Sequence, residues 1–127
     1  MQQKVHFLIP EIINKLKKKK IIVNNINIER DFVYVSDLVD AIIKSIFLKK
    51  KFEIINIGSG KSYKISEIID ILQKIKRTDI VVKNRGIYRP NEILFTKLDI
   101  KKARKILNWK PQWNLEKGLR NIIYKKN

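Results

Sequence analysis

Residues 30–38, Arg-Asp-Phe-Val-Tyr-Val-Ser-Asp-Leu, decide how the first half of this 127-residue chain folds. Aromatic and β-branched side chains dominate their first part, which predicts a strand over Arg30–Val35. Ser36 follows where a hydroxyl can cap a helix. A helix is predicted after it because a stripe recurs at helical spacing, formed by Leu38, Ala41, Ile42, Ser45 and Ile46. The stretch therefore predicts a strand that leads directly into a helix.

The same periodicities predict the elements on either side of this stretch. Before it, a helix opens at Pro10 and ends in the run Lys17–Lys20, where positive charge suits a helix C-terminus. A short strand over Ile21–Val23 and an asparagine-rich turn then lead to Arg30. The elements predicted after it are a buried strand over Glu53–Ile57 ending in the turn Gly58–Gly60, a helix capped by Ser66, a strand over Ile80–Val82, and helices over Asp99–Leu107 and Asn114–Ile123.

This order of elements predicts the fold class, a mixed α/β lobe of short strands and helices. Four short strands do not complete a doubly wound sheet. No internal repeat, glycine- and serine-rich linker or low-complexity tract divides the chain. Residues 1–127 are therefore expected to form a single unit.

Composition excludes several classes of protein. Apolar residues make up 44% of the chain, which is enough for a core and excludes a disordered tail. No apolar run reaches the roughly 18 residues that a membrane-spanning helix needs. The absence of cysteine excludes disulfides, thiolate metal sites and a cysteine nucleophile. We expect a cytoplasmic protein with no membrane partner.

The net charge of +17 has two interpretations. A strongly basic chain can bind nucleic acid, and this alternative is kept. However, 23 of the 29 cations are lysine, and lysine occurs here with 25 isoleucines and 11 asparagines. This combination is typical of AT-rich codons, so the composition favours a genomic bias over a nucleic-acid surface.

The groups that would carry catalysis are absent. Four glycines, at positions 58, 60, 86 and 118, cannot build a dinucleotide fingerprint or a P-loop, so Gly58–Gly60 is interpreted as a tight turn. The one histidine, His6, is interpreted as incidental, and no tyrosine is followed four positions later by lysine. We therefore predict no catalytic, cofactor-binding or metal-binding residue in this chain.

Five blocks of sequence, in order, resemble one family. Residues 30–38 resemble the RDFVYVxDL segment of the NAD-dependent epimerase/dehydratases, the extended short-chain dehydrogenase/reductases that act on nucleotide-sugars. The other blocks are Asn56–Gly60, similar to NIGSG; Arg89–Glu92, similar to the RxxD/E substrate clamp; Asp99–Pro111, similar to DxxKAxxxLGWxP; and Leu115–Leu119, similar to LEEGL. Together they cover nearly the whole chain.

The resemblance implies that the chain is the C-terminal, substrate-binding part of such an enzyme and lacks most of the Rossmann domain. In the family, the missing N-terminal part holds NAD(P) and the catalytic Tyr-x-x-x-Lys. The chain is therefore expected to be inactive alone, as a fragment, a split-gene product or a truncated relic of carbohydrate biosynthesis. Its expected partners are a nucleotide-sugar and either a separately encoded Rossmann half or a second copy. The blocks Gly60–Glu67 and Arg89–Glu92 are most similar to GDP-6-deoxy-mannose reductases and GDP-mannose 4,6-dehydratases.

The resemblance also assigns candidate substrate-binding residues. It implies that Arg30 and Arg89 reach the substrate pyrophosphate, where a guanidinium makes charge-assisted hydrogen bonds. It implies that Phe32 lies beside the nucleotide and Glu92 near its ribose hydroxyls. The strand Ile21–Val23 is expected to offer backbone groups to the base.

Three further expectations follow. The turn before Arg30 has Ile26 where the family has glycine, and a β-branched residue resists left-handed backbone, so this turn is expected to be reshaped. Asn108 can replace the glycine that ends a helix, and Trp109 is expected to anchor the core rather than stack on bases. Without a Rossmann half, the lobe is expected to expose an apolar patch. A non-catalytic interaction remnant stays a further alternative.

Overall fold

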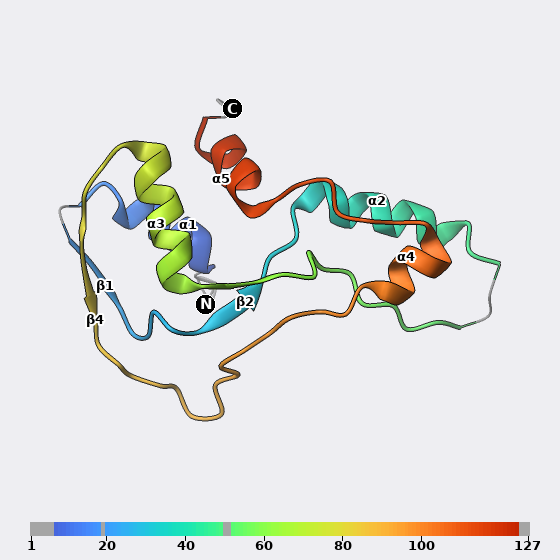
Figure 1. The fold of residues 1–127 in the computed structure, drawn as a ribbon, viewed down its shortest axis with the longest axis horizontal. Coiled ribbons are helices and arrows are strands. Elements are labelled where there is room, and N and C mark those ends of the chain that lie inside the picture. Colours follow the sequence, from blue (N-terminus) through green and yellow to red (C-terminus); the bar gives the residue numbers. More distant parts are fainter. Residues whose placement is uncertain (1–6, 19, 50–51, 125–127) are drawn as a thin grey trace, which may run out of the picture. The chain divides into compact units, whose positions relative to one another are not determined.

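The computed structural model describes residues 7–18, 20–49 and 52–124. Helices and short strands alternate along these residues, which confirms the predicted mixed α/β class (Figure 1). The elements are α1 (Leu8–Lys15), β1 (Lys20–Val23), β2 (Glu29–Asp31), α2 (Val35–Ile46), β3 (Ser62–Lys64), α3 (Ile65–Lys76), β4 (Val81–Asn84), α4 (Lys101–Leu107) and α5 (Leu115–Tyr124).

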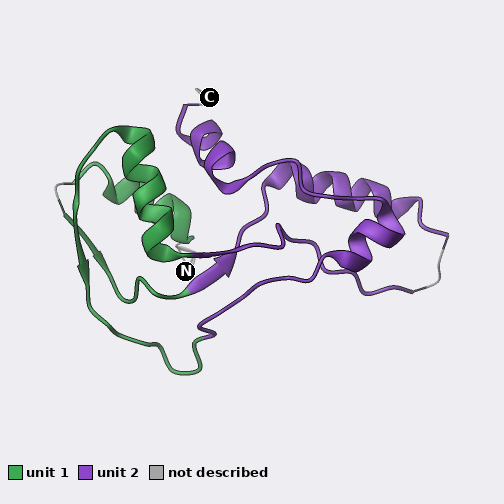
Figure 2. Cartoon of the chain, in the orientation of Figure 1, with its two compact units in different colours: residues 1–28, 64–92 green, residues 29–63, 93–127 purple. Residues whose placement is uncertain are grey.

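The chain divides into two compact units, and each is built from two separate stretches of sequence (Figure 2). Unit 1 comprises Met1–Ile28 and Lys64–Glu92, and unit 2 comprises Glu29–Tyr63 and Ile93–Asn127. The expectation of one nucleotide-sugar-binding lobe over residues 1–127 stays a prediction.

Unit 1 is organised around a parallel pair of strands. β1 and β4 lie side by side, with Lys20 paired to Val81 and Val23 paired to Asn84 (Figure 1). One apolar stripe of α3 is buried, as the sequence predicts, because its spacing places it on a single helix face. The buried side chains of this unit are Ile12, Leu16, Ile21, Ile28, Ile65, Ile68, Ile69, Leu72, Ile75 and Ile80.

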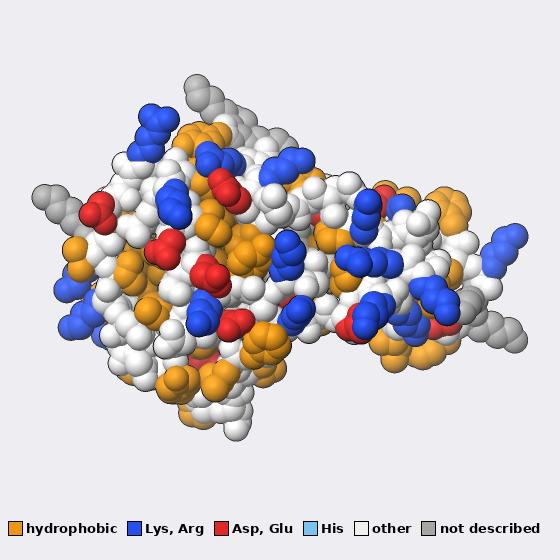
Figure 3. Space-filling model, viewed as in Figure 1, with side chains coloured by type: hydrophobic (Ala, Val, Ile, Leu, Met, Phe, Trp, Pro, Cys, Tyr) orange, Lys and Arg blue, Asp and Glu red, His pale blue; other side chains and the backbone are white. Residues whose placement is uncertain are grey.

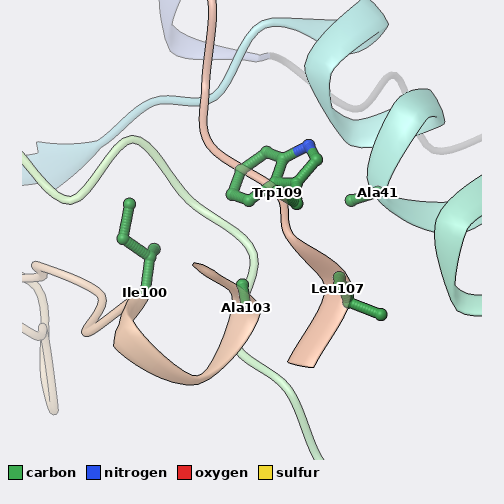
Figure 4. Packing of buried hydrophobic residues seen from close by; sticks show 5 residues of the cluster. All are labelled: Ala41, Ile100, Ala103, Leu107 and Trp109. Atoms are coloured by element: carbon green, nitrogen blue, oxygen red, sulfur yellow. The ribbon is translucent and has the colours of Figure 1, made fainter. Parts of the chain in front are cut away.

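Unit 2 has a core built around Trp109, which is 1% exposed. Its buried neighbours are Ala41 from α2 and three residues of the α4 region, Ile100, Ala103 and Leu107 (Figure 4). The indole Nε1 donates a hydrogen bond of 3.0 Å to the Asp37 carbonyl oxygen, so its polar atom is satisfied inside the core. These contacts confirm that Trp109 is a packing anchor.

Asn108 ends α4 in a left-handed backbone conformation, as expected from the sequence. Asn108 has φ 46° and ψ 44°, a conformation that asparagine tolerates better than most residues. It turns the chain directly before Trp109, so the helix end and the core anchor are coupled. At the start of α5, the Asn114 side chain accepts the backbone N–H of Lys117 at 2.8 Å, as a helix N-cap does.

The strand predicted over Arg30–Val35 is shorter than expected. β2 ends at Asp31, and α2 begins at Val35, so Ser36 lies in the first turn of the helix rather than at its cap. Tertiary contacts explain the early end: the Tyr34 ring stacks on Trp113 with centroids 4.2 Å apart, and its hydroxyl contacts the Asn121 amide. These contacts fix Tyr34 outside the sheet.

The buried strand predicted over Glu53–Ile57 is wrong. This segment is irregular, and its side chains alternate between half-buried and exposed. Ile55 and Ile57 pack against the Trp109 core, whereas Phe52 and Ile54 are 81% and 71% exposed. No described strand pairs with the segment, so the backbone lacks the partner that would make it a strand.

Smaller differences concern element ends. β3, a three-residue strand paired with β2, is too short to show a period in the sequence. α3 begins at Ile65 instead of being capped by Ser66, because the Glu67 carboxylate accepts the Lys64 backbone N–H at 2.6 Å. β4 covers Val81–Asn84, so it begins one residue and ends two residues later than the predicted strand Ile80–Val82.

An apolar surface lies on unit 2, which agrees with the expected apolar patch. The helix predicted after Arg30–Leu38 forms, but of its predicted stripe only Ala41 is buried. We define the α2 surface as the exposed apolar residues on and after this helix, namely Val35, Leu38, Val39, Ile42, Ile43, Ile46, Phe47, Phe52 and Ile54. Such a concentration of large apolar side chains is typical of surfaces that another structure covers.

The α2 surface is expected to make the isolated chain bind a hydrophobic dye and self-associate. The double variant Phe47→Ser/Phe52→Ser removes two of its most exposed rings, at 77% and 81% exposure, and should reduce dye fluorescence severalfold. Sedimentation and dye titration measure both effects, with Tyr124→Ser, an exposed ring outside this surface, as control. A compact wild-type monomer that binds no dye would contradict the expectation.

Candidate functional site

A cavity of about 130 Å³ lies entirely within unit 1. Four of the six predicted substrate-binding residues line it: Ile21, Val23, Arg89 and Glu92. The remaining lining comes from α1, the turn after β1 and the start of α3, through Glu11, Ile12, Lys15, Ile22, Asn24, Asn25, Ile28 and Ile65. The structure therefore brings together residues that lie almost 70 positions apart in the sequence.

A tight turn presents Arg89 to this cavity. Proline occupies its second position and Asn91 its third, with φ 59°, and the Glu92 N–H donates to the Arg89 carbonyl oxygen at 3.1 Å. Fixed proline φ followed by a left-handed asparagine is the pattern of a type II turn. The Glu92 carboxylate in turn accepts the Arg89 N–H at 3.1 Å. The backbone of Arg89 is thereby held at both its N–H and its carbonyl.

The turn between β1 and β2 forms the second wall. Asn25 is 2% exposed, and its side-chain oxygen accepts the Asn27 backbone N–H at 2.9 Å, which is an Asx turn. Neither Asn24 nor Ile26 has positive φ, so the turn has the non-glycine geometry expected from Ile26. The Ile26 carbonyl accepts the Ser66 N–H at 3.1 Å, which ties the turn to the start of α3.

The two basic side chains that line the cavity, Lys15 and Arg89, differ in whether they form an ion pair. Lys15 forms an ion pair of 2.5 Å with Glu11 one helical turn earlier, and its ammonium also approaches the Ile22 carbonyl at 3.4 Å. Arg89 is exposed, and within the described part of the chain it makes no ion pair. Arg89 is therefore the cation of this cavity that is available for an anion.

Arg30 and Phe32, the other two predicted residues, belong to unit 2, and both are half-buried. Arg30 lies in β2, and its Nη1 donates to the Glu29 carbonyl oxygen at 2.8 Å. Phe32 follows the end of the strand.

Sequence reasoning missed several residues of these two regions. Glu11 and Lys15 line the cavity, and their spacing of four on a helix was the available signal. Asn25 shapes the turn, and the run of asparagines at positions 24, 25 and 27 is a weak sign of an Asx turn. Asp31 binds the Gly58–Gly60 turn across 28 residues, a contact with no local signature.

The described residues contain neither a candidate metal site nor a helix suited to cross a membrane. Among residues 7–18, 20–49 and 52–124, no group of three or more His, Asp or Glu side chains gathers as a metal site requires. In the same residues, no helix is both long and apolar enough to cross a bilayer.

The comparisons with known proteins agree on one family. The family model described as GDP-mannose 4,6 dehydratase matches residues 1–122. The chain is 35% identical over 97 residues to a UDP-glucuronate 4-epimerase of Thermodesulfobacterium geofontis, covering 74% of this chain and 29% of that protein.

Solved structures show the same relationship. A UDP-glucuronic acid 4-epimerase mutant of Bacillus cereus, in complex with a UDP-sugar analogue and NAD, matches with a TM-score of 0.82 and 30% identity, over 93% of this chain and 38% of that one. RMD of Pseudomonas aeruginosa, complexed with NADPH, shares the fold with a TM-score of 0.85 at 23% identity, over 95% and 42% of the two chains.

The chain belongs to the NAD-dependent epimerase/dehydratase family, the extended short-chain dehydrogenase/reductases, as the resemblance of its five blocks indicates. It spans about a third of the length of the curated relatives that it matches.

The glycine-rich turn of this chain does not fit a phosphate of the NAD(P) that those structures hold. Its one glycine-rich turn is Gly58–Gly60, and a dinucleotide site would need the N–H groups of such a turn to face a phosphate. Here the N–H groups of Ser59 and Gly60 donate to the Asp31 carboxylate, at 2.7 and 3.0 Å. A negative phosphate could not take the place of that carboxylate without displacing it.

Proposed function

We propose that the chain is the C-terminal, substrate-binding lobe of a nucleotide-sugar epimerase, dehydratase or reductase. In this proposal the unit 1 cavity binds part of the nucleoside diphosphate, and the chain performs no catalysis alone. The observation that carries the proposal is that Ile21, Val23, Arg89 and Glu92 line one cavity. Two of them lie in β1 and two in the turn after β4, and the parallel pairing of these two strands brings both blocks to the same cavity.

Each lining residue has a chemical role in the proposal. Arg89 donates charge-assisted hydrogen bonds to a phosphate, which suits a guanidinium whose backbone the turn already holds. Glu92 lies near the ribose hydroxyls, and the β1 backbone faces the base. The cavity, at about 130 Å³, is smaller than the roughly 300–1,000 Å³ of most ligand pockets, so it accommodates one part of the substrate.

Other parts of the proposal rest on the family relationship. Arg30 is proposed as a second phosphate ligand and Phe32 as a neighbour of the nucleotide. NAD(P) is the proposed cofactor of the complete enzyme, because solved structures of the family hold it. A GDP-linked sugar is the proposed substrate, because the matching family model is that of GDP-mannose 4,6 dehydratase.

The nucleic-acid alternative has lost its best candidates for base stacking. Trp109 is buried, and the Trp113 ring is covered by Tyr34 and by the Lys117 ammonium, 4.4 Å from its centroid. Lys and Arg side chains are distributed over both units on the face shown, with acidic and apolar groups between them (Figure 3). On the face shown, the basic side chains are therefore interrupted, unlike the continuous basic groove that tracks a nucleic-acid backbone (Figure 3).

The Arg89→Ala variant tests the proposal. It is expected to weaken binding of a nucleoside diphosphate by tenfold or more, because one charge-assisted phosphate contact contributes about 1.5–3 kcal/mol. Titration calorimetry with GDP, UDP and their sugars measures the affinity of wild type and variant. The matched control is Lys17→Gln/Lys18→Gln, which removes two exposed cations outside the cavity lining and should change affinity less than twofold.

The same titration, repeated with an oligonucleotide at two salt concentrations, distinguishes nucleoside-diphosphate binding from nucleic-acid binding. A nucleic-acid protein sums many phosphate contacts, so its affinity falls steeply with salt and depends on the lysine pair as much as on Arg89. That outcome, with no nucleoside diphosphate bound, would refute the proposed function.

A further inference from the structure

The Asp31 carboxylate occupies the Gly58–Gly60 turn of unit 2. Its Oδ1 accepts the Ser59 backbone N–H and the Ser59 hydroxyl, both at 2.7 Å. Its Oδ2 accepts the Gly60 N–H at 3.0 Å and the Leu98 N–H at 3.1 Å. One side chain therefore receives four hydrogen bonds and joins two segments that are distant in sequence.

The turn has the shape of an anion-binding nest. Gly60 has φ 73°, a left-handed conformation that lets successive N–H groups point to one side. A Cβ on Gly58 would lie 2.7 Å from Leu98 Cδ1 and 3.1 Å from Asp31 Oδ2, so this position must stay without a side chain for the carboxylate to enter. Both glycines thus serve the seating of Asp31.

Arg30 lies between two fixed points of β2. On one side, the Glu29 N–H donates to the Leu94 carbonyl at 2.8 Å, and the Glu29 carbonyl accepts the Thr96 N–H at 3.1 Å. On the other side, Asp31 is held by its side chain as described above. Successive residues of a strand point to opposite faces, so the Arg30 and Asp31 side chains leave the strand in opposite directions.

We propose that Asp31 is a positioning residue for substrate binding: by filling the nest with its carboxylate, it fixes the backbone from which Arg30 reaches the substrate diphosphate. The inference rests on the proposed function, because Arg30 is a phosphate ligand only there. It goes further by giving a role to a residue and a turn that do not touch the ligand.

The test is a double-mutant cycle in the full chain, read out by calorimetric titration with GDP and UDP. Asp31→Ala should weaken binding about tenfold, as Arg30→Ala does, since each removes the same phosphate contact. The double variant should be no weaker than either single one. Formate, a small carboxylate that fits the emptied nest, should restore severalfold affinity to Asp31→Ala and none to Arg30→Ala.

Asp37 provides the matched control. It is a buried carboxylate of the same unit, and it accepts the backbone N–H groups of Gln112 and Trp113 at 3.1 and 3.0 Å. Asp37→Ala should lower the melting temperature while changing the affinity for the ligand less than twofold. Because Asp31→Ala could fail to fold, Asp31→Asn is made in parallel; its single side-chain oxygen preserves half of the contacts and should give an intermediate loss.

The outcomes separate the two proposals. A wild-type chain that binds no nucleoside diphosphate refutes the proposed function and, with it, this inference. A wild type that binds, with Asp31→Ala at unchanged affinity or with additive losses in the double variant, overturns the inference alone. The inference about Asp31 is also overturned if Asp37→Ala weakens ligand binding as much as Asp31→Ala does, or if formate restores no affinity to Asp31→Ala.

Discussion

Trp109→Ala is expected to lower the free energy of unfolding of unit 2 by about 3–5 kcal/mol, the cost of truncating a fully buried large aromatic residue. Domains are stable by about 5–15 kcal/mol in total, so a loss of this size removes a large share of the stability. The substitution removes the ring that contacts Ala41, Ile100, Ala103 and Leu107. It also deprives the Asp37 carbonyl of its indole donor.

Urea denaturation followed by circular dichroism measures this loss. Trp113→Ala is the control, because Trp113 is half-buried and stacks on Tyr34 at the edge of the unit. An aromatic pair contributes about 0.5–1.5 kcal/mol beyond its buried area, so this variant should lose clearly less than Trp109→Ala. Equal losses would show that Trp109 is not the centre of the core.

The 127-residue chain is expected to bind no NAD(P) and to convert no nucleotide-sugar, which is a complete loss relative to a full-length enzyme of the family. The hydride chemistry belongs to the cofactor, which a protein site must hold. The sequence has no glycine fingerprint and no tyrosine four positions before a lysine. The Gly58–Gly60 turn, its nearest approach to such a fingerprint, already holds Asp31.

Fluorescence titration with NADH and NADPH measures cofactor binding, and a full-length enzyme of the family serves as positive control. An assay with GDP-, UDP- and dTDP-linked sugars measures turnover. Saturable micromolar binding with a stoichiometry near one would contradict the prediction, and so would any turnover above the rate without protein.

Elements with a long apolar period were predictable from the sequence. The buried face of α3 follows from five apolar residues at helical spacing, and the end of α4 follows from Asn108. Strands were predictable only where the fold supplies a partner, as it does for β1 and β4. The segment Glu53–Ile57 has the composition of a buried strand, yet the described residues provide no strand beside it. Composition reports what a segment favours, whereas pairing depends on a neighbour elsewhere in the fold.

The candidate site was predictable only in part. The family blocks brought attention to Arg89 and Glu92, and the structure places both in one cavity with Ile21 and Val23. Asp31 was invisible at the sequence level, because its partners lie 28 to 67 positions away. Hydrogen bonds between residues so far apart produce no periodic pattern in the sequence. An aspartate next to an arginine is, from the sequence alone, equally consistent with a surface ion pair.

Exposed and half-buried side chains alternate along residues 52–57, and this pattern affects how readily the chain aggregates after synthesis. Phe52 and Ile54 point outward from an extended backbone that no described strand covers. Such a stretch is a template on which other chains can align, and native proteins shield it with charge, proline or a covering element. Neither charge nor proline interrupts Ile54–Ile57. Expression together with a protein that covers this stretch is therefore expected to reduce aggregation and raise the soluble yield.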